Sequence, residues 1–180
     1  MKTTLFVVLA VMLVSAMGGR ALAGDQPPRL GESDGKTVEG RSVAPTALTI
    51  ATYSGYFASN QFEPDAPASL VVISDQKQFD QVFGVAFVMG DKSHRLPKDA
   101  FQSLLVLAII KRGKATWAYK VEGVSLKAGV VEFRYSTTET KSDSATFACP
   151  LIVSIPKGRY TAVQFVEGGK PVKKVEIERD

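Results

Sequence analysis

The stretch that decides the fold runs from residue 103 to residue 122, Ser-Leu-Leu-Val-Leu-Ala-Ile-Ile-Lys-Arg-Gly-Lys-Ala-Thr-Trp-Ala-Tyr-Lys-Val-Glu. Within it, residues 104–110 form an unbroken apolar run that is too short to span a bilayer and rich in branched side chains. Such a run is typical of a strand buried on both faces. After a turn, Trp117, Tyr119 and Val121 share one face of an alternating segment, which indicates a half-exposed strand.

Strand-like segments recur along the chain at the spacing of about 8–12 residues that sandwiches and barrels show. We expect strands at 47–53, 70–73, 130–137, 145–155, 160–166 and 172–177, with loops at 56–69 and 138–144. One helix is expected, because Asp75 and Gln78 can form a capping box ahead of an apolar face, and Gly84 should end it. The predicted fold is therefore all-β or β-dominated: a single antiparallel sandwich or partly open barrel with one short helix packed on it.

The first 23 residues have the pattern of a signal peptide. Lys2 is followed by an apolar stretch at 5–17 and by the small-x-small site Ala21-Leu22-Ala23. The apolar stretch is shorter than a spanning helix needs. We therefore expect a protein that is exported to the periplasm or outside the cell, with no membrane span after cleavage. Residues 24–45 are rich in Pro, Gly and charge and predict a flexible tether, so that 46–180 form a single β-rich domain.

The charge balance gives little support to nucleic-acid binding. The sequence has 22 basic and 18 acidic residues, and removal of the leader takes away Lys2 and Arg20 but no acid. The remaining 20 basic and 18 acidic residues leave a net charge of +2. A charge this small argues against a nucleic-acid partner.

The residues that usually carry enzyme chemistry are scarce. The sequence has one cysteine, Cys149, and one histidine, His94, far apart in the chain. A cysteine or serine nucleophile needs a nearby base, and a metal site needs clustered ligands. We expect no enzyme activity, no catalytic residue, no metal and no cofactor, and we interpret Cys149 as a small apolar residue within a strand.

The cationic turn after residue 110 supplies the candidate binding residues Arg112, Lys114, Trp117 and Tyr119. Arg, Trp and Tyr are common anchors of protein interfaces, so a binding loop is one interpretation. The other is that Trp117 and Tyr119 point into the core, since they share the face of Val121. Both interpretations remain open at this stage.

Residues 70–166 resemble the C-terminal domain of the PrcB-like proteins, accessory proteins first associated with a spirochaete protease complex. The resemblance is carried, in chain order, by the apolar strand 104–110 and by Gly113, Thr116, Tyr119, Val121, Val124, Thr146, Pro150, Pro156 and Lys157. Two features depart from the family pattern: Thr116-Trp117-Ala118 stands where the family has Gly-Gly before the tyrosine, and the lipoprotein cysteine of some members is missing.

The resemblance implies a non-catalytic protein that stabilises or assembles a partner protein, possibly a protease. It does not identify the partner. Two alternatives stay open: a β-sandwich of the protease-inhibitor kind, in which the segment 112–119 enters a peptidase cleft, and an exported domain that binds a small ligand in a concave apolar pocket.

Overall fold

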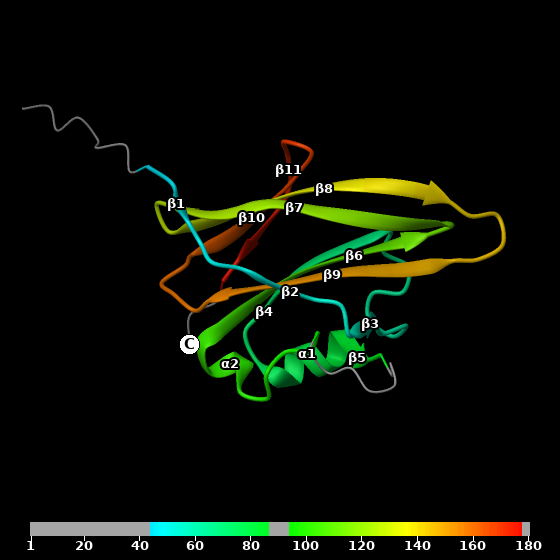
Figure 1. Ribbon diagram of the computed structural model, residues 1–180, viewed down its shortest axis with the longest axis horizontal. Helices are drawn as coiled ribbons and strands as arrows, with labels where there is room; N and C mark the ends of the chain where they lie inside the picture. The colour runs from blue at the N-terminus through cyan, green and yellow to red at the C-terminus, as the bar shows by residue number, and fades with distance from the viewer. Residues whose placement is uncertain (1–43, 87–93, 178–180) are drawn as a thin grey trace, which may run out of the picture. The chain divides into compact units, whose positions relative to one another are not determined.

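The computed structural model describes residues 44–86 and 94–177, which contain eleven strands and two short helices. The predicted segment 1–23 and nearly all of 24–45 lie outside the described residues. The described part forms two facing sheets, with the helices on the outer side of one of them (Figure 1). The β-dominated sandwich expected from the sequence is confirmed.

The first sheet, called sheet A, has five strands in the order β1-β7-β8-β10-β11. Their bounds are β1 (Thr46–Ala47), β7 (Ala115–Lys127), β8 (Val130–Lys141), β10 (Ala162–Glu167) and β11 (Lys170–Glu176). The β7–β8 hairpin turns at Ala128 and Gly129, and the β10–β11 hairpin turns at Gly168 and Gly169. All four turn residues have positive φ, as the tightest hairpin turns require.

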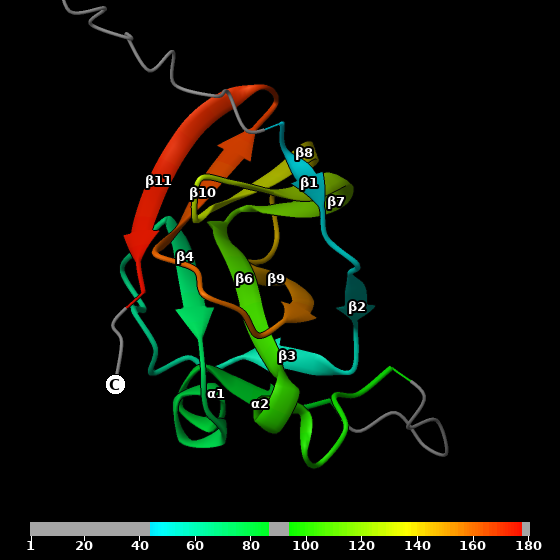
Figure 2. The same cartoon turned by 90° about the vertical axis from the view of Figure 1, so that its left-hand side faces the viewer.

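The second sheet, sheet B, has four strands in the order β2-β9-β6-β4. Their bounds are β2 (Ala51–Tyr53), β4 (Ala68–Ile73), β6 (Leu104–Gly113) and β9 (Phe147–Pro156). A separate two-stranded ribbon consists of β3 (Tyr56–Ala58) and β5 (Phe83–Val85). The helices are α1 (Gln76–Val82) and α2 (Ala100–Ser103). Figure 2 shows the two sheets nearly end-on, with α1 and α2 below sheet B.

Strand β6 lies between two cores, as its apolar run predicts. Leu105, Leu107 and Ile109 contribute to the core between the sheets, which also contains Phe133 and Phe165. On the opposite face, Val106, Ala108 and Ile110 belong to a second core that packs against α1 and the β3–β5 ribbon. Each large side chain buried in these cores contributes on the order of 1.5–3 kcal/mol to folding.

Helix α1 begins at the predicted cap but ends earlier than predicted. The Asp75 carboxylate accepts a hydrogen bond of 2.8 Å from the N–H of Gln78, and the Gln78 side chain accepts one of 3.2 Å from the N–H of Ser74. The helix ends at Val82, and Gly84 lies in β5 opposite Phe57. A Cβ at Gly84 would lie 2.3 Å from the Phe57 ring, so this glycine makes room for a cross-strand aromatic contact and does not end the helix.

Several strand boundaries also differ from the prediction. The expected strand 47–53 is split, because the chain pairs in sheet A as β1 and then crosses to sheet B as β2 (Figure 1). The expected loop 56–69 contains β3, and β8 continues to Lys141 through most of the expected loop 138–144. Strand β9 runs through Pro150, but β2 pairs with it only at Ile152–Ser154, so β9 is locally an edge at the proline.

One strand pair departs from the antiparallel pattern. Strands β8 and β10 are neighbours in sheet A and run parallel, with Tyr135 opposite Glu167. The reason is that the chain leaves sheet A after β8, returns along β9 in sheet B, and re-enters sheet A in its original direction. Within the described residues no helix is long and apolar enough to cross a membrane.

Candidate functional site

Three of the four candidate binding residues line one cleft at the end of the sandwich where the chain passes from β6 to β7. The cleft has a volume of about 340 Å³. Arg112, Lys114 and Trp117 line it, together with Gly113, Ala115, Glu139, Lys141, Ser142 and Asp143. We call it the Trp117 cleft. The predicted cationic turn is much shorter than expected, because Lys111, Arg112 and Gly113 lie in β6 and Lys114 alone links the two strands.

Arg112 is fixed by the strand and loop beside it. It continues the face of Val106, Ala108 and Ile110. Its guanidinium donates one hydrogen bond of 2.7 Å to the Ser69 hydroxyl and another of 2.8 Å to the carbonyl oxygen of Phe62. These bonds give the wall of the cleft a fixed cation, which limits the side-chain entropy lost on binding.

Trp117 packs against the end of β6. A Cβ at Gly113 would lie 3.2 Å from Cη2 of the indole, and the φ of Gly113 is +148°. Both the contact and the backbone conformation therefore favour glycine at this position. Trp117 is half-buried, opposite Glu139 of β8. A half-buried indole beside cations is a typical anchor for a bound protein segment.

The link between β6 and β7, at Lys114, is held in place by a backbone hydrogen bond. Its carbonyl oxygen accepts a hydrogen bond of 3.0 Å from the N–H of Ser142, in the second link between the sheets. The side chain of Lys114 is exposed, as is that of Lys141. Two ammonium groups are thus available at the mouth of the cleft, next to the carboxylates of Glu139 and Asp143.

Tyr119 does not line this cleft. It lies against the core between the sheets, and its hydroxyl donates a hydrogen bond of 2.7 Å to the carbonyl oxygen of Cys149. Burial raises the pKa of Tyr119 well above its ordinary value of 10.0, so the phenol remains neutral. The structure therefore places Trp117 at the cleft and Tyr119 inside the sandwich, although the two share one face of β7. Cys149 is half-buried within β9.

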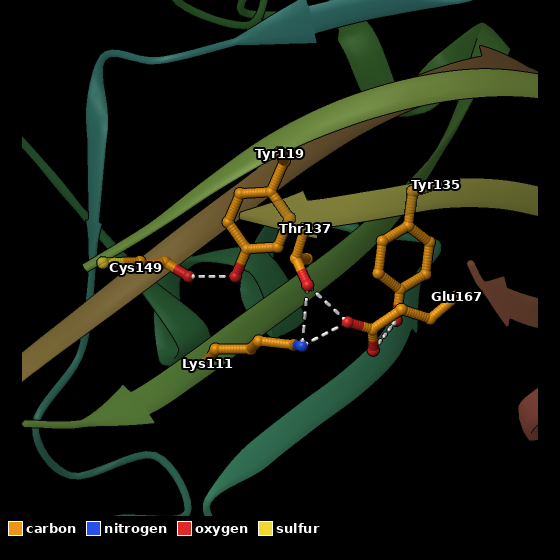
Figure 3. Close-up of polar contacts among 6 residues, drawn as sticks. All are labelled: Lys111, Tyr119, Tyr135, Thr137, Cys149 and Glu167. Atoms are coloured by element: carbon orange, nitrogen blue, oxygen red, sulfur yellow. Dashed lines mark hydrogen bonds and ion pairs between the residues drawn. The ribbon is translucent and has the colours of Figure 1, made fainter. Parts of the chain in front are cut away.

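A polar cluster between the sheets lies next to Tyr119 and was not expected from the sequence (Figure 3). The Lys111 ammonium of β6 forms an ion pair with the Glu167 carboxylate of β10. Lys111 also donates to the Thr137 hydroxyl over 3.2 Å, and that hydroxyl donates to Glu167 over 2.6 Å. The Tyr135 hydroxyl donates to the same carboxylate over 3.3 Å.

The protonation states of this cluster follow from its contacts. Burial by itself would raise the pKa of Glu167, but hydrogen bonds from Lys111 and Thr137 outweigh it and hold the pKa below the ordinary value of 4.5. Burial, and then the charge of Glu167, raise the pKa of Tyr135 well above 10.0. The cluster therefore holds one cation and one anion with neutral hydroxyls around them, an arrangement that joins the sheets.

The structure has other clefts of similar size, including one of about 290 Å³ whose lining contains the aromatic residues Tyr56, Phe79 and Phe83. Another of about 290 Å³, between the end of β4 and the end of β11, has no aromatic ring; it is lined by Val72, Ser74, Asp75, Gln78, Leu105, Glu176 and Ile177. Among the described residues there is no group of three or more potential metal ligands. The backbone carbonyl of His94 accepts a bond of 3.3 Å from the N–H of Gly55.

Comparisons with known proteins give no match, whether with protein-family models, with curated proteins or with solved structures.

Proposed function

We propose that this protein is an exported, non-catalytic accessory protein of the PrcB-like kind, which binds a partner protein through the Trp117 cleft and stabilises it. The observation that carries the proposal is the placement of Arg112, Lys114 and Trp117 around one cleft. Trp is one of the residues that most often dominate the binding energy of protein interfaces. The resemblance to PrcB-like proteins supports the non-catalytic, partner-binding role but not the choice of Trp117, because Thr116-Trp117-Ala118 departs from the family pattern.

The charges at the cleft favour a particular kind of contact. The Arg112 guanidinium already donates hydrogen bonds to Ser69 and Phe62. The cations of the cleft that are available to a ligand are therefore Lys114 and Lys141. We expect the partner to present an apolar side chain to Trp117 and a carboxylate to these two lysines. One exposed segment of the partner that carries a long apolar side chain and a carboxylate would make both contacts.

The protease-inhibitor alternative has less support from this geometry. It relies on the segment 112–119 as an inserting loop, whereas all of that segment except Lys114 lies in β6 and β7. The small-ligand alternative relies on a concave apolar pocket, whereas charged side chains make up much of the Trp117 cleft.

The test is affinity capture from the exported fraction of the native cell, with the wild-type protein and two variants. Lys114→Glu reverses a charge at the mouth of the cleft, and Lys127→Glu reverses a charge at the opposite end of β7. We expect one stoichiometric partner with the wild type and with Lys127→Glu, and loss of most of it with Lys114→Glu. Equal recovery with both variants, or no stoichiometric partner at native concentration, would contradict the proposal.

A further inference from the structure

One short segment joins the edges of both sheets on one flank of the sandwich (Figure 2). It runs from residue 46 to residue 53 and contains β1, which pairs with β7 of sheet A, and β2, which pairs with β9 of sheet B. Residues 48–50 alone separate the two strands. The same stretch of backbone therefore adds a strand to the edge of each sheet. We call residues 46–53 the strap.

The strap is held in place by few contacts. Strand β1 pairs with β7 at two positions, and β2 pairs with β9 at three. The N–H of Leu48 also donates a hydrogen bond of 2.8 Å to the Val124 carbonyl. The Tyr53 hydroxyl lies 3.0 Å from the Ser154 hydroxyl. The side chains of Leu48 and Ile50 pack against the core between the sheets, so these two residues are the apolar anchors of the strap in that core.

Burial distinguishes the strap from the central strands. No residue of the strap is buried, because each is exposed or half-buried. In β6, by contrast, residues 105–110 are all buried, with at most 4% of any of them exposed. Segments with few buried apolar contacts open at a lower free energy than core strands do. We therefore expect the strap to open more readily than β6.

The rest of the sandwich has its own contacts. Without the strap, sheet A keeps the order β7-β8-β10-β11 and sheet B keeps the order β9-β6-β4. The buried residues of the core between the sheets all lie outside the strap. The bond from Tyr119 to Cys149 and the ion pair of Lys111 with Glu167 join the two sheets without it. The strap can therefore leave while both sheets stay folded.

The chain is fixed again directly after the strap. The N–H of Gly55 donates to the His94 carbonyl over 3.3 Å, and the Gly55 carbonyl accepts a bond of 3.0 Å from the N–H of Ala86. Strand β3 then begins at Tyr56 and pairs with β5. The exposed residue Ser54 lies between the strap and this fixed point. An opening of the strap should therefore end at Ser54.

We propose that the strap is a latch, which opens and closes as one unit about Ser54 while both sheets stay folded. Strands β1 and β2 open together because Leu48 and Ile50, which lie between them, leave the core in the same step. The open latch uncovers the edge of β7 at 124–126 and the edge of β9 at 152–154. It lies at the other end of β7 from the Trp117 cleft, so this inference does not depend on the proposed function.

The test is hydrogen exchange of the purified variant Ala47→Cys/Ser125→Cys/Cys149→Ala, with and without a disulfide between the two new cysteines. Ala47 and Ser125 are opposite each other, next to the hydrogen-bonded pair of Leu48 and Val124. They therefore form a non-hydrogen-bonded pair, whose Cα atoms lie about 4.5 Å apart, a distance that a disulfide can span. The reduced form of the same variant is the control.

We expect the amides of the whole strap in the reduced form to exchange at least about 100-fold faster than those of residues 105–110, relative to their intrinsic rates. The disulfide should slow the exchange of the strap at least about tenfold, in β2 as well as in β1. Slower exchange in β1 alone would show that the two strands open separately, and would overturn the proposal. Exchange of the strap no faster than that of residues 105–110 would also overturn it.

Leu48→Ala tests an anchor of the latch without a cross-link. We expect it to speed the exchange of the strap about tenfold, because it removes a half-buried side chain from the core. The fluorescence of Trp117 should stay unchanged, since both sheets remain folded. Thr49→Ala is the matched control, because Thr49 is exposed and should alter neither measurement. Unfolding of the sheets in Leu48→Ala, or an unchanged rate in the strap, would contradict the latch.

Discussion

Lys111 and Glu167 form an ion pair that joins the two sheets, with the ammonium on β6 and the carboxylate at the end of β10. Their side chains are 18% and 25% exposed. The pair continues the inner faces of both strands beyond the apolar core, so it replaces apolar packing at the end of the sandwich where the Trp117 cleft lies. The stability of that end therefore depends on a charged contact as well as on burial.

Glu167→Gln should lower the free energy of unfolding by about 1–2 kcal/mol. Loss of one partner of a fully buried pair costs about 3–5 kcal/mol, and the partial exposure here reduces that figure. Chemical denaturation at neutral pH gives the measurement. Glu132→Gln is the matched control, because Glu132 pairs with Arg134 on the exposed surface and should cost less than about 0.5 kcal/mol. Similar losses in both variants would contradict a special role for Glu167.

The stability that Glu167 provides should disappear in acid. Its pKa in the folded protein lies below the ordinary value of 4.5, so the folded state binds the proton less readily than the unfolded state. The contribution is present above 4.5 and is lost as the pH falls through the folded-state pKa. The difference in unfolding free energy between the wild type and Glu167→Gln should therefore shrink below that pH. A difference that stays constant in acid would refute this linkage.

Tyr119→Phe should lower the free energy of unfolding by about 1 kcal/mol at neutral pH, since the Cys149 carbonyl loses its hydrogen-bond donor. The same variant should be less sensitive to alkali. Because burial raises the pKa of Tyr119, the stability of the neutral phenol is present below 10.0 and is lost as the pH rises through the folded-state value. Denaturation of both proteins between neutral and alkaline pH provides the comparison. If the wild type and Tyr119→Phe lost equal unfolding free energy in alkali, ionisation of Tyr119 would not contribute to the alkaline loss.

Gly113→Ala should displace the indole of Trp117. A Cβ there would lie 3.2 Å from the ring, in a backbone conformation with a φ of +148°. Trp117 is the only tryptophan in the sequence, so its fluorescence reports on the cleft directly, and we expect a red shift in Gly113→Ala. Gly123→Ala is the control, because Gly123 has a φ of +154° but nothing within 4 Å of the added Cβ. It should leave the emission unchanged, and a shift in both variants would point to backbone strain instead of contact.

Much of the fold could be predicted because strands and caps leave local signals. The run 104–110 indicated burial on both faces, and the hairpin turns at Gly129 and Gly168 were recognisable from the glycines. The parallel pairing of β8 and β10 could not be predicted, because it depends on β9 crossing to the other sheet between them. Pairing between distant strands leaves little trace in local alternation.

The candidate site was predictable only in part, for the same reason. The burial of 104–110 on both faces already implied that Lys111 and Arg112 point in opposite directions, and this signal was missed. Alternation left Tyr119 open between a binding loop and an inner face, and the structure places it inside the sandwich. The contact of Lys111 with Glu167 and Thr137 could not be predicted from the sequence, since it depends on the register that sets Tyr135 opposite Glu167.

The central claim is that Trp117 anchors a partner whose abundance depends on this protein. Its most direct test is the quantity of exported proteins in cells that lack the gene, complemented with the wild type, with Trp117→Ala or with Lys127→Glu. We predict that one exported protein falls in the deletion, recovers with the wild type and with Lys127→Glu, and stays low with Trp117→Ala although that variant accumulates normally. Full recovery with Trp117→Ala, or no change on deletion, would contradict the account.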